Sequence, residues 1–311
     1  MSLELFFSLI VGIFGAFFGS FANVVIYRLK NGGDICVDRS KCPQCQHVLS
    51  VFDLVPVLSW LFLEGKCRYC QKPISVQYPL VETLFGVSWF WWIQTTGVPE
   101  IFTDYFYFVF TLYLISSLII ITVYDILYLE IPDQVSFPLI GISSLMIFLP
   151  QTPSLVSALG GCFLVYTFFY LQIFIPGTIY AIAQKKQFLI KNLFLDYFIF
   201  PCWLFCSLFF SQKKLNKIKI FQEKSDDNLP AWIGGGDLRL AFIMGFVLGT
   251  KGTIMALFLA YIIGAIGGIF IVIVKGKKNN VLPFGPFLSL GTYLSLLYGL
   301  YLWEWYVQLI F

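Results

Sequence analysis

The chain has 311 residues, of which 59% are hydrophobic, 19% aromatic and only 12% charged. Soluble domains carry about 25% charged residues, so this chain lacks the polar surface that a soluble globule needs. A soluble enzyme, a disordered protein and a secreted disulfide scaffold are therefore excluded. We expect an all-α polytopic membrane protein with about eight transmembrane helices and a small cytoplasmic lobe. The net charge of +3 is small and its basic residues are clustered, so we expect no nucleic-acid partner.

The first predicted domain is a transmembrane span over residues 1–27. Residues 5–27 form a run of 23 residues without a charge, long enough to cross a bilayer. Arg28 and Lys30 follow this run, whereas a cleavable signal peptide has its basic residues before the apolar run. We therefore expect a retained span whose N-terminus lies outside the cell.

The second predicted domain is a polar lobe over residues 28–79, whose seven Lys and Arg residues place it in the cytoplasm. It contains two CxxC pairs, Cys42-Pro-Gln-Cys45 and Cys67-Arg-Tyr-Cys70. Two such turns supply the tetrahedral sulfur site that zinc prefers, and four thiolates leave no open position for water. We expect a structural zinc ion here; a pair of redox dithiols is the alternative.

The remaining cysteines and the single histidine carry no clear chemistry. We interpret Cys36, Cys162, Cys202 and Cys206 as packing residues. His47 lies beside the first CxxC pair and is expected to be a solvated loop residue rather than a metal ligand.

Three further predicted domains complete the chain: spans that carry the first candidate aspartate (80–180), an insertion (181–230), and spans that carry the second (231–311). Within them the individual spans are expected near 80–98, 105–124, 135–149, 154–176, 238–250, 252–274 and 282–310.

The insertion contains an apolar segment, 192–210, that is broken by Pro201. If this segment crossed the membrane, the lysines that follow it would lie outside the cell, against the positive-inside rule. We therefore expect a re-entrant or interface-lying hairpin, followed by a solvated loop.

Two motifs place carboxylates at the ends of predicted spans. The first runs from Asp125 to Asp133, and the second is Gly234-Gly235-Gly236-Asp237-Leu238-Arg239-Leu240. Ionisable groups at membrane depth are expensive and point to function; a wetted loop and a helix-capping Asp after a flexible hinge are the simpler alternatives. Two neighbouring carboxylates cannot both ionise easily, so together they suit aspartyl protease chemistry.

The order of these motifs resembles the type IV prepilin peptidases (prepilin leader peptidase/N-methyltransferase), a family of GxGD membrane aspartyl proteases. The resemblance covers most of the chain. It rests on both CxxC pairs, both Asp motifs and five further segments: Gly19–Arg28, Pro56–Trp60, Pro73–Ser75, Tyr78–Glu82 and Leu282–Pro286.

The resemblance implies that Asp125 and Asp237 are the catalytic pair, with Asp133, Gly234 and Gly236 in supporting roles. It also implies that Cys42, Cys45, Cys67 and Cys70 bind zinc. The implied substrates are prepilins or pseudopilins of type IV pili and type II secretion, which lie in the membrane and are cut on the cytoplasmic face of the bacterial inner membrane. Methylation of the new N-terminus with S-adenosylmethionine is implied as well, through contacts that the sequence does not assign.

Other functions remain possible at this point. A related GxGD peptidase for preflagellin or competence pseudopilins is the nearest alternative. A membrane thiol oxidoreductase and a transporter are more remote alternatives, because neither function accounts for all of the sequence motifs. The chain departs from the family in one respect: Asp125 and Asp237 are 112 positions apart, because of the insertion.

Overall fold

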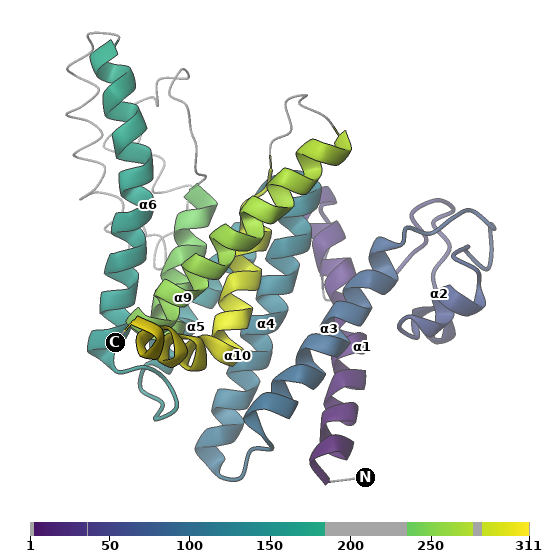
Figure 1. Cartoon of the computed structure of the whole chain (residues 1–311). Coiled ribbons are helices and arrows are strands. Elements are labelled where there is room, and N and C mark those ends of the chain that lie inside the picture. The colour runs from purple at the N-terminus through teal and green to yellow at the C-terminus, as the bar shows by residue number, and fades with distance from the viewer. Residues whose placement is uncertain (1–2, 36, 184–234, 276–281, 311) are drawn as a thin grey trace.

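The computed structural model describes residues 3–35, 37–183, 235–275 and 282–310 (Figure 1). In these ranges the secondary structure is helical, apart from two isolated β-bridges in the lobe. The insertion segment 192–210 lies outside the described residues. The elements are α1 (Leu3–Asn31), η1 (Val51–Leu54), α2 (Leu58–Phe62), α3 (Gln77–Thr96), α4 (Phe102–Tyr128), α5 (Asp133–Met146), α6 (Leu155–Ala183), α9 (Gly235–Lys275) and α10 (Gly285–Ile310).

The predicted all-α architecture is confirmed in this part of the chain, and each of the eight predicted spans falls on a helix. The number of membrane crossings is confirmed only in part. Among the described residues, four helical stretches are long and apolar enough to cross a membrane: Leu3–Asn31, Phe102–Tyr128, Leu155–Gln172 and Gly236–Val274. The last of these contains two of the predicted spans.

A bend at Gly249 divides α9 into two arms. Gly249 has φ 63° and ψ −173°, a conformation that glycine adopts without steric penalty. A Cβ at this position would lie 2.6 Å from Ser157 Oγ. Next to the bend, the backbone N–H of Thr250 donates to Ser157 Oγ (3.1 Å), and the Thr250 hydroxyl donates to the Ser157 carbonyl (2.8 Å). The break between the two arms therefore lies just before the position that the sequence predicted.

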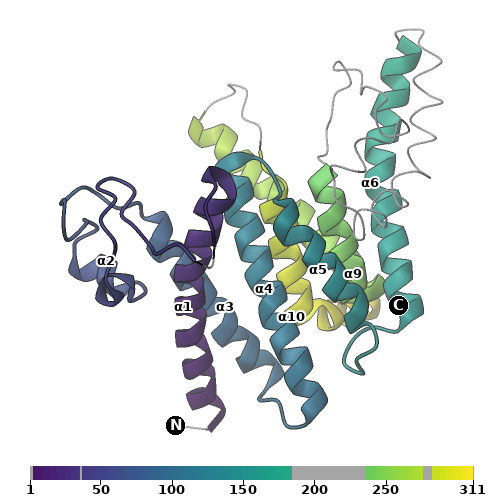
Figure 2. The ribbon, with the colours of Figure 1, turned by 180° about the vertical axis from the view of Figure 1, so that it is seen from behind.

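Helix α4 is the central element, because it contributes to both hydrophobic cores. Leu114, Leu118 and Ile121 pack into a core shared with α5, α6, α9 and α10. Ile115 and Val123 pack into a second core with α1 and α3. Figure 2 shows α4 between these two groups of helices. Both groups are consequently fixed relative to the C-terminal end of α4.

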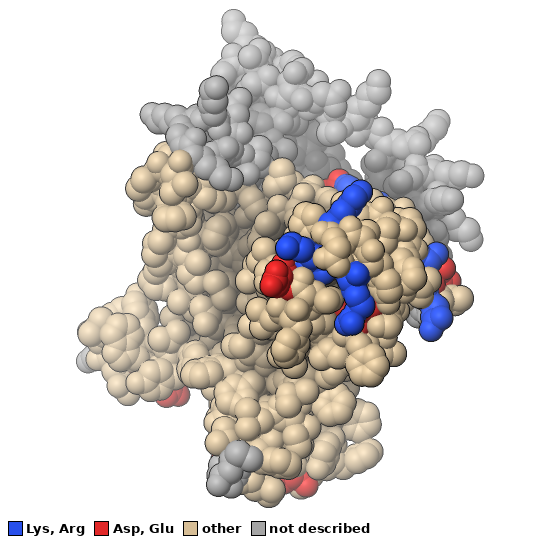
Figure 3. All heavy atoms as spheres, turned by 90° about the vertical axis from the view of Figure 1, so that its right-hand side faces the viewer, with Lys and Arg blue, Asp and Glu red and all other residues tan. Residues whose placement is uncertain are grey.

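Charged residues are distributed unevenly over the described surface. Figure 3 shows Lys and Arg gathered on the lobe, while the helices below it expose mainly uncharged side chains. The outer face of α1 exposes large apolar side chains, such as Ile13 and Phe14 (each 60% exposed). An apolar belt with a polar end is the distribution expected of a protein held in a bilayer.

The tight contact between α6 and α9 yields a testable prediction. A Cβ at Gly245 would meet the backbone of Cys162, so Gly245→Ala forces the helices apart. Overpacking of this kind costs about 1–3 kcal/mol, and the apparent Tm in detergent should fall by several degrees. Gly141→Ala, where a Cβ meets nothing within 4 Å, is the matched control and should leave the Tm unchanged or raise it. An unchanged Tm for Gly245→Ala would contradict this packing.

Candidate active site and metal centre

Three aspartates lie where helices begin or end on the same side of the bundle. Asp125 is in the last turn of α4, Asp133 is the first residue of α5, and Asp237 is in the first turn of α9. Figures 1 and 2 both show these three helix ends on the side of the bundle that carries the lobe. The Asp125–Asp133 and Gly234–Leu240 motifs, which are far apart in the sequence, therefore meet at one end of the fold.

Asp125 is buried, and its carboxylate is held by the backbone. The residue is only 6% exposed. Its Oδ2 accepts a hydrogen bond of 3.0 Å from the N–H of Gly285. Gly285 begins α10, so the carboxylate also lies at the positive end of a helix dipole. A Cβ at position 285 would lie 2.5 Å from Oδ2. Only glycine can therefore occupy this position without displacing the carboxylate.

Asp237 is half-buried, in the first turn of α9. The carboxylate of Asp237 interacts electrostatically with Tyr261. The Tyr261 ring packs against Phe284 at 5.1 Å, and Phe284 precedes the glycine that binds Asp125. The ring contact packs α9, the helix that begins with the Asp237 motif, against the residue that precedes α10.

The glycines before Asp237 allow its helix to approach the loop between α4 and α5. A Cβ at Gly236 would lie 2.7 Å from Ile131 Cβ, so this position requires a residue without a side chain. Gly234, the other glycine predicted to support the site, lies outside the described residues.

Asp133 forms an ion pair with Arg239. The Arg239 guanidinium also contacts Ser136 Oγ (3.3 Å) and lies 5.0 Å from the centre of the Phe137 ring. This cluster joins the start of α5 to the start of α9. Arg239 lies two residues after Asp237 in the sequence. Because its carboxylate is engaged by Arg239, Asp133 suits a supporting role that fixes the start of α5 against α9.

Gly285 and Arg239 lie within the sequence motifs, but no local pattern indicates what these residues bind. Gly285 contacts an aspartate 160 positions away, and Arg239 contacts one 106 positions away. The arrangement as a whole brings the helix ends that carry Asp125, which is buried, and Asp237, which is half-buried, to one side of the bundle. Two carboxylates that lie close together can share a proton and act as general base and general acid.

The four cysteines of the lobe form a second, separate site. Their sulfur atoms lie within 4.8 Å of one another, which suits a single metal ion. The two turns have the same geometry: the N–H of Cys42 donates to the carbonyl of His47, and the N–H of Cys67 donates to that of Lys72. The predicted Cys42, Cys45, Cys67 and Cys70 cluster is therefore assembled by the fold.

The electrostatics of this cluster favour the thiolate at Cys42 but not at Cys45. A hydrogen bond from the His47 backbone lowers the pKa of Cys45, but burial and the neighbouring thiols outweigh it and raise the pKa to about 11. Burial raises the pKa of the Cys42 thiol, but hydrogen bonds from the backbone of Cys45 and Gln44 and from neighbouring thiols outweigh it and bring the pKa to about 7. Metal ions bind the thiolate form, so the donor set suits a soft, tetrahedral ion. His47 is not among the ligands; its ring packs against Tyr69 at 3.7 Å.

Asp53 fixes the short helix η1 to the second CxxC turn. Its carboxylate accepts hydrogen bonds from Arg68 Nε (2.7 Å), Ser50 Oγ (2.8 Å) and the Tyr69 hydroxyl (3.1 Å). Burial raises the pKa of Asp53, but the bonds from Ser50, Arg68 and Tyr69 outweigh it, so the pKa lies below its usual value. The lobe is thus held by polar contacts and the cysteine cluster rather than by an apolar core.

Comparison with known proteins finds two matching family models. The first, described as Bacterial Peptidase A24 N-terminal domain, matches residues 13–95 and includes the four cysteines. The second, described as Type IV leader peptidase family, matches residues 112–269 and includes all three aspartates. The second match alone covers half of the chain.

Curated relatives match nearly the whole chain. Proteins named prepilin leader peptidase/N-methyltransferase from Aeromonas hydrophila and Bacillus subtilis (strain 168) are each 27% identical to it. The alignments cover 97% of this chain and 94% of the Aeromonas protein, and 96% of this chain and 98% of the Bacillus protein. A protein of the same name from Myxococcus xanthus is 45% identical over 29% of this chain and 27% of its own length. No solved structure matches.

The cysteine cluster predicts that one substitution removes the metal. In Cys67→Ser, zinc bound by the purified full-length chain should fall from about one ion per chain to nearly none, because structural sites depend on all four ligands. The lobe should then become sensitive to trypsin. Zinc is measured by mass spectrometry.

Cys162→Ala is the control, because Cys162 is a buried cysteine of α6, and its zinc content should not change. A wild-type chain that contains no zinc but holds disulfides between these cysteines would contradict the metal site and favour redox dithiols.

Proposed function

The chain belongs to the type IV leader peptidase family, and we propose that it is a membrane aspartyl endopeptidase that removes the leader peptide from type IV prepilins or pseudopilins. We propose that it also methylates the new N-terminus with S-adenosylmethionine. The observation that supports the proposal is that the helix ends carrying Asp125 and Asp237 lie on one side of the bundle, where the close approach of Gly236 to Ile131 and the Asp133–Arg239 ion pair join them, within the residues that the family model matches. The names of the full-length relatives support both activities.

In the proposed mechanism, one carboxylate of the pair is ionised and the other is protonated. The ionised carboxylate removes a proton from a water molecule, whose oxygen attacks the carbonyl carbon of the scissile bond. The protonated carboxylate donates a hydrogen bond to the carbonyl oxygen. When the tetrahedral intermediate collapses, the carbon–nitrogen bond breaks and the leaving amine takes up a proton. The Gly285 N–H holds the Asp125 carboxylate in place throughout these steps.

A cavity at this end of the bundle, lined by Asp133 but by neither Asp125 nor Asp237, offers room for the substrate. It has a volume of about 370 Å³ and is lined by residues that include Leu29, Tyr124, Glu130 and Asp133. Because it is bounded by the ends of α1 and α4, a substrate helix in the bilayer would reach it laterally. We propose that this end of the bundle faces the cytoplasm, since the basic lobe lies on the same side (Figure 3).

The remaining parts of the proposal concern the architecture. We propose eight transmembrane helices in the bacterial inner membrane, with the domain boundaries given by the sequence. Zinc bound by the four cysteines would hold the lobe together and take no part in hydrolysis, because a four-sulfur site has no open position. Asp133 would support the site through its ion pair with Arg239.

Substitution of either aspartate tests the proposal directly. Asp125→Asn and Asp237→Asn keep the shape of the side chain but prevent proton transfer, so prepilin leader cleavage should fall by about 10²–10⁴-fold. Asp104→Asn is the matched control, because Asp104 caps the opposite end of α4; its activity should not change. Cleavage is measured on full-length prepilin in detergent.

If Asp125→Asn or Asp237→Asn cleaves normally, that residue is not part of the dyad. A wild-type chain that cleaves preflagellin or competence pseudopilins but no type IV prepilin would favour the nearest alternative substrate class.

Gly285→Ala tests the positioning of the catalytic carboxylate. The new Cβ displaces Asp125 Oδ2, so kcat should fall by about 10²-fold with little change in KM, because a misplacement of about 1 Å at the reacting groups has an effect of this size. Gly264→Ala adds a Cβ at ordinary contact distance from Phe287 (3.5 Å) and should retain activity. Full activity of Gly285→Ala would refute the positioning role.

A further inference from the structure

The lobe exposes a group of large apolar side chains on two short neighbouring helices. Val51 and Phe52 belong to η1, and Leu58, Leu61 and Phe62 belong to α2. All five are more than half exposed, and Phe62 is 83% exposed. Because η1 and α2 contact each other, we call these five residues the apolar patch. Single exposed apolar residues are ordinary on a protein surface, but a group of them marks an interaction surface.

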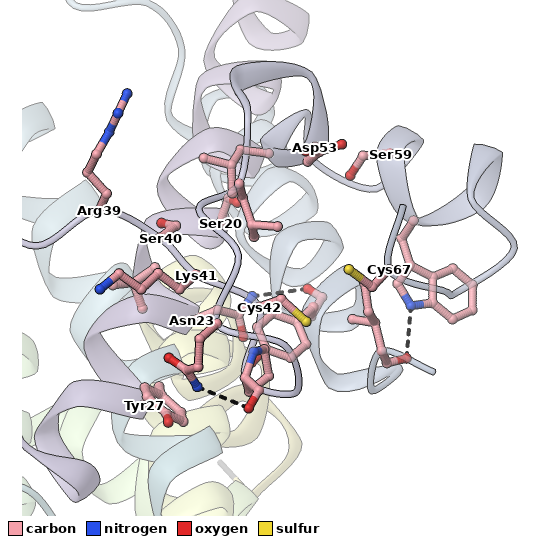
Figure 4. Close-up of a pocket in the computed structure, with 18 of the residues that line it drawn as sticks. Ser20, Asn23, Tyr27, Arg39, Ser40, Lys41, Cys42, Asp53, Ser59 and Cys67 are labelled. Carbon is pink, nitrogen blue, oxygen red and sulfur yellow. Dashed lines mark hydrogen bonds between the residues drawn. The ribbon is translucent and has the colours of Figure 1, made fainter. Parts of the chain in front are cut away.

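The two faces of α2 differ in what they contact. Its three patch residues are spaced by three and four positions, so they share one face of the helix. The other side of the helix is held by the lobe: the Trp60 Nε1–H donates to the carbonyl of Ile74 (3.2 Å), and Ser59 lines the cavity between the lobe and α1 (Figure 4). The apolar face of α2 therefore takes no part in packing the lobe.

Basic side chains accompany the apolar patch. Residues 28–79 contain seven Lys and Arg against four Asp and Glu, and Figure 3 shows the basic side chains gathered on the lobe. Lys66 follows the end of α2 by four positions, and Arg68 Nε donates to Asp53 of η1 (2.7 Å). Both basic side chains are about half exposed; Lys66 lies 3.7 Å from Glu64, an exposed pair that binds it weakly. Positive charge thus borders both helices of the patch.

The apolar patch lies beside the transmembrane helices. The chain enters the lobe from α1 and leaves it into α3, and the N–H of Val57, the residue before α2, donates to Glu82 Oε2 of α3 (2.7 Å). Figures 1 and 2 both show α2 beside α1 and below the level of the C-terminal end of that helix, rather than beyond it. The bilayer that surrounds α1 and α3 therefore reaches the lobe.

We propose that the apolar patch, with Lys66 and Arg68 beside it, binds the surface of the surrounding bilayer and prefers anionic lipids. The inference rests on the structure of the lobe and not on the proposed peptidase activity. Apolar side chains that enter the headgroup region, with Lys and Arg next to them, bind membranes through buried apolar area and through attraction to anionic lipids. The basic side chains hold their charge at the phosphate groups while their stems lie along apolar surface.

A bilayer suits the apolar patch better than a soluble protein partner does. The lobe is tethered to the membrane at both ends, so lipid is present at the patch at a high effective concentration. The positive charge beside the patch complements the phosphate of anionic headgroups. Lipid contact fixes the height of the lobe relative to the bilayer, and the Val57–Glu82 hydrogen bond transmits this constraint to α3.

Photo-crosslinking to lipid tests the proposal in the full-length chain. The photoreactive residue p-benzoylphenylalanine replaces Phe62, and the chain is reconstituted in vesicles of phosphatidylcholine and phosphatidylglycerol. Illumination should attach phospholipid at position 62, detected by mass spectrometry of the peptide that contains it. Gln44 is the matched control position, because it is an exposed residue of the lobe outside the patch, and it should capture several-fold less lipid. Zinc content establishes that each variant is folded.

Lys66→Gln tests the contribution of charge. In the chain labelled at position 62, it should lower the ratio of phosphatidylglycerol to phosphatidylcholine adducts about fivefold, because one basic residue near an anionic surface contributes about 1 kcal/mol. Lys251→Gln, at an exposed lysine of α9 outside the lobe, should leave the ratio unchanged.

The proposal is overturned if position 62 captures lipid no more often than position 44, or captures another protein chain in place of lipid. A ratio that Lys66→Gln leaves unchanged would refute the preference for anionic lipids.

Discussion

The hydrogen bond between the Gly285 N–H and the Asp125 carboxylate is the contact on which the proposed active site depends. It joins the last turn of α4 to the first turn of α10 at a position that is closed to water. Because α4 packs into both hydrophobic cores, this one bond fixes the aspartate relative to the whole bundle. A buried carboxylate needs such a donor, since a charge without a partner is strongly destabilising away from water.

The other contacts around the site complete the same end of the bundle. The Asp133–Arg239 ion pair fastens the start of α5 to the start of α9, and the close approach of Gly236 to Ile131 brings the second motif against the loop after α4. On the far side of the end of α1, the cysteine lobe encloses a separate cavity. The end of α1 thus contributes to both cavities, with Tyr27 and Arg28 lining one and Leu29 the other.

Much of this arrangement could be predicted from the sequence, because its signals are local. Long uncharged runs predicted the helices, and the spacing within each CxxC pair predicted a cluster of four cysteines that the fold assembles. The aspartate motifs correctly marked helix ends. The count of eight membrane crossings is confirmed only in part, because α5, for example, has only 14 residues and rises about 21 Å. The bend of α9 depends on contacts of Gly249 with Ser157 and Pro153, which no local pattern shows.

The contacts that build the candidate site were beyond prediction from the sequence, because each joins residues distant in the chain. The motif around Gly285 was visible, but its bond to Asp125 spans 160 positions. In the sequence, Asn23 is a polar residue within a predicted transmembrane span. Its buried oxygen without a hydrogen-bond partner becomes apparent only when α3 and the lobe pack around it. The position of Glu82 against Val57 likewise depends on tertiary structure.

The central claim is that Asp125 and Asp237 act together on one scissile carbonyl. The most direct measurement is the affinity of a prepilin peptide in which a hydroxyethylene group replaces the scissile amide, compared with the same peptide lacking the hydroxyl. The account predicts that the hydroxyl improves binding to the wild type by about 10²-fold or more, as expected for a mimic of the tetrahedral intermediate, and that this gain disappears in Asp125→Asn and in Asp237→Asn. A gain that persists in either variant would contradict the account.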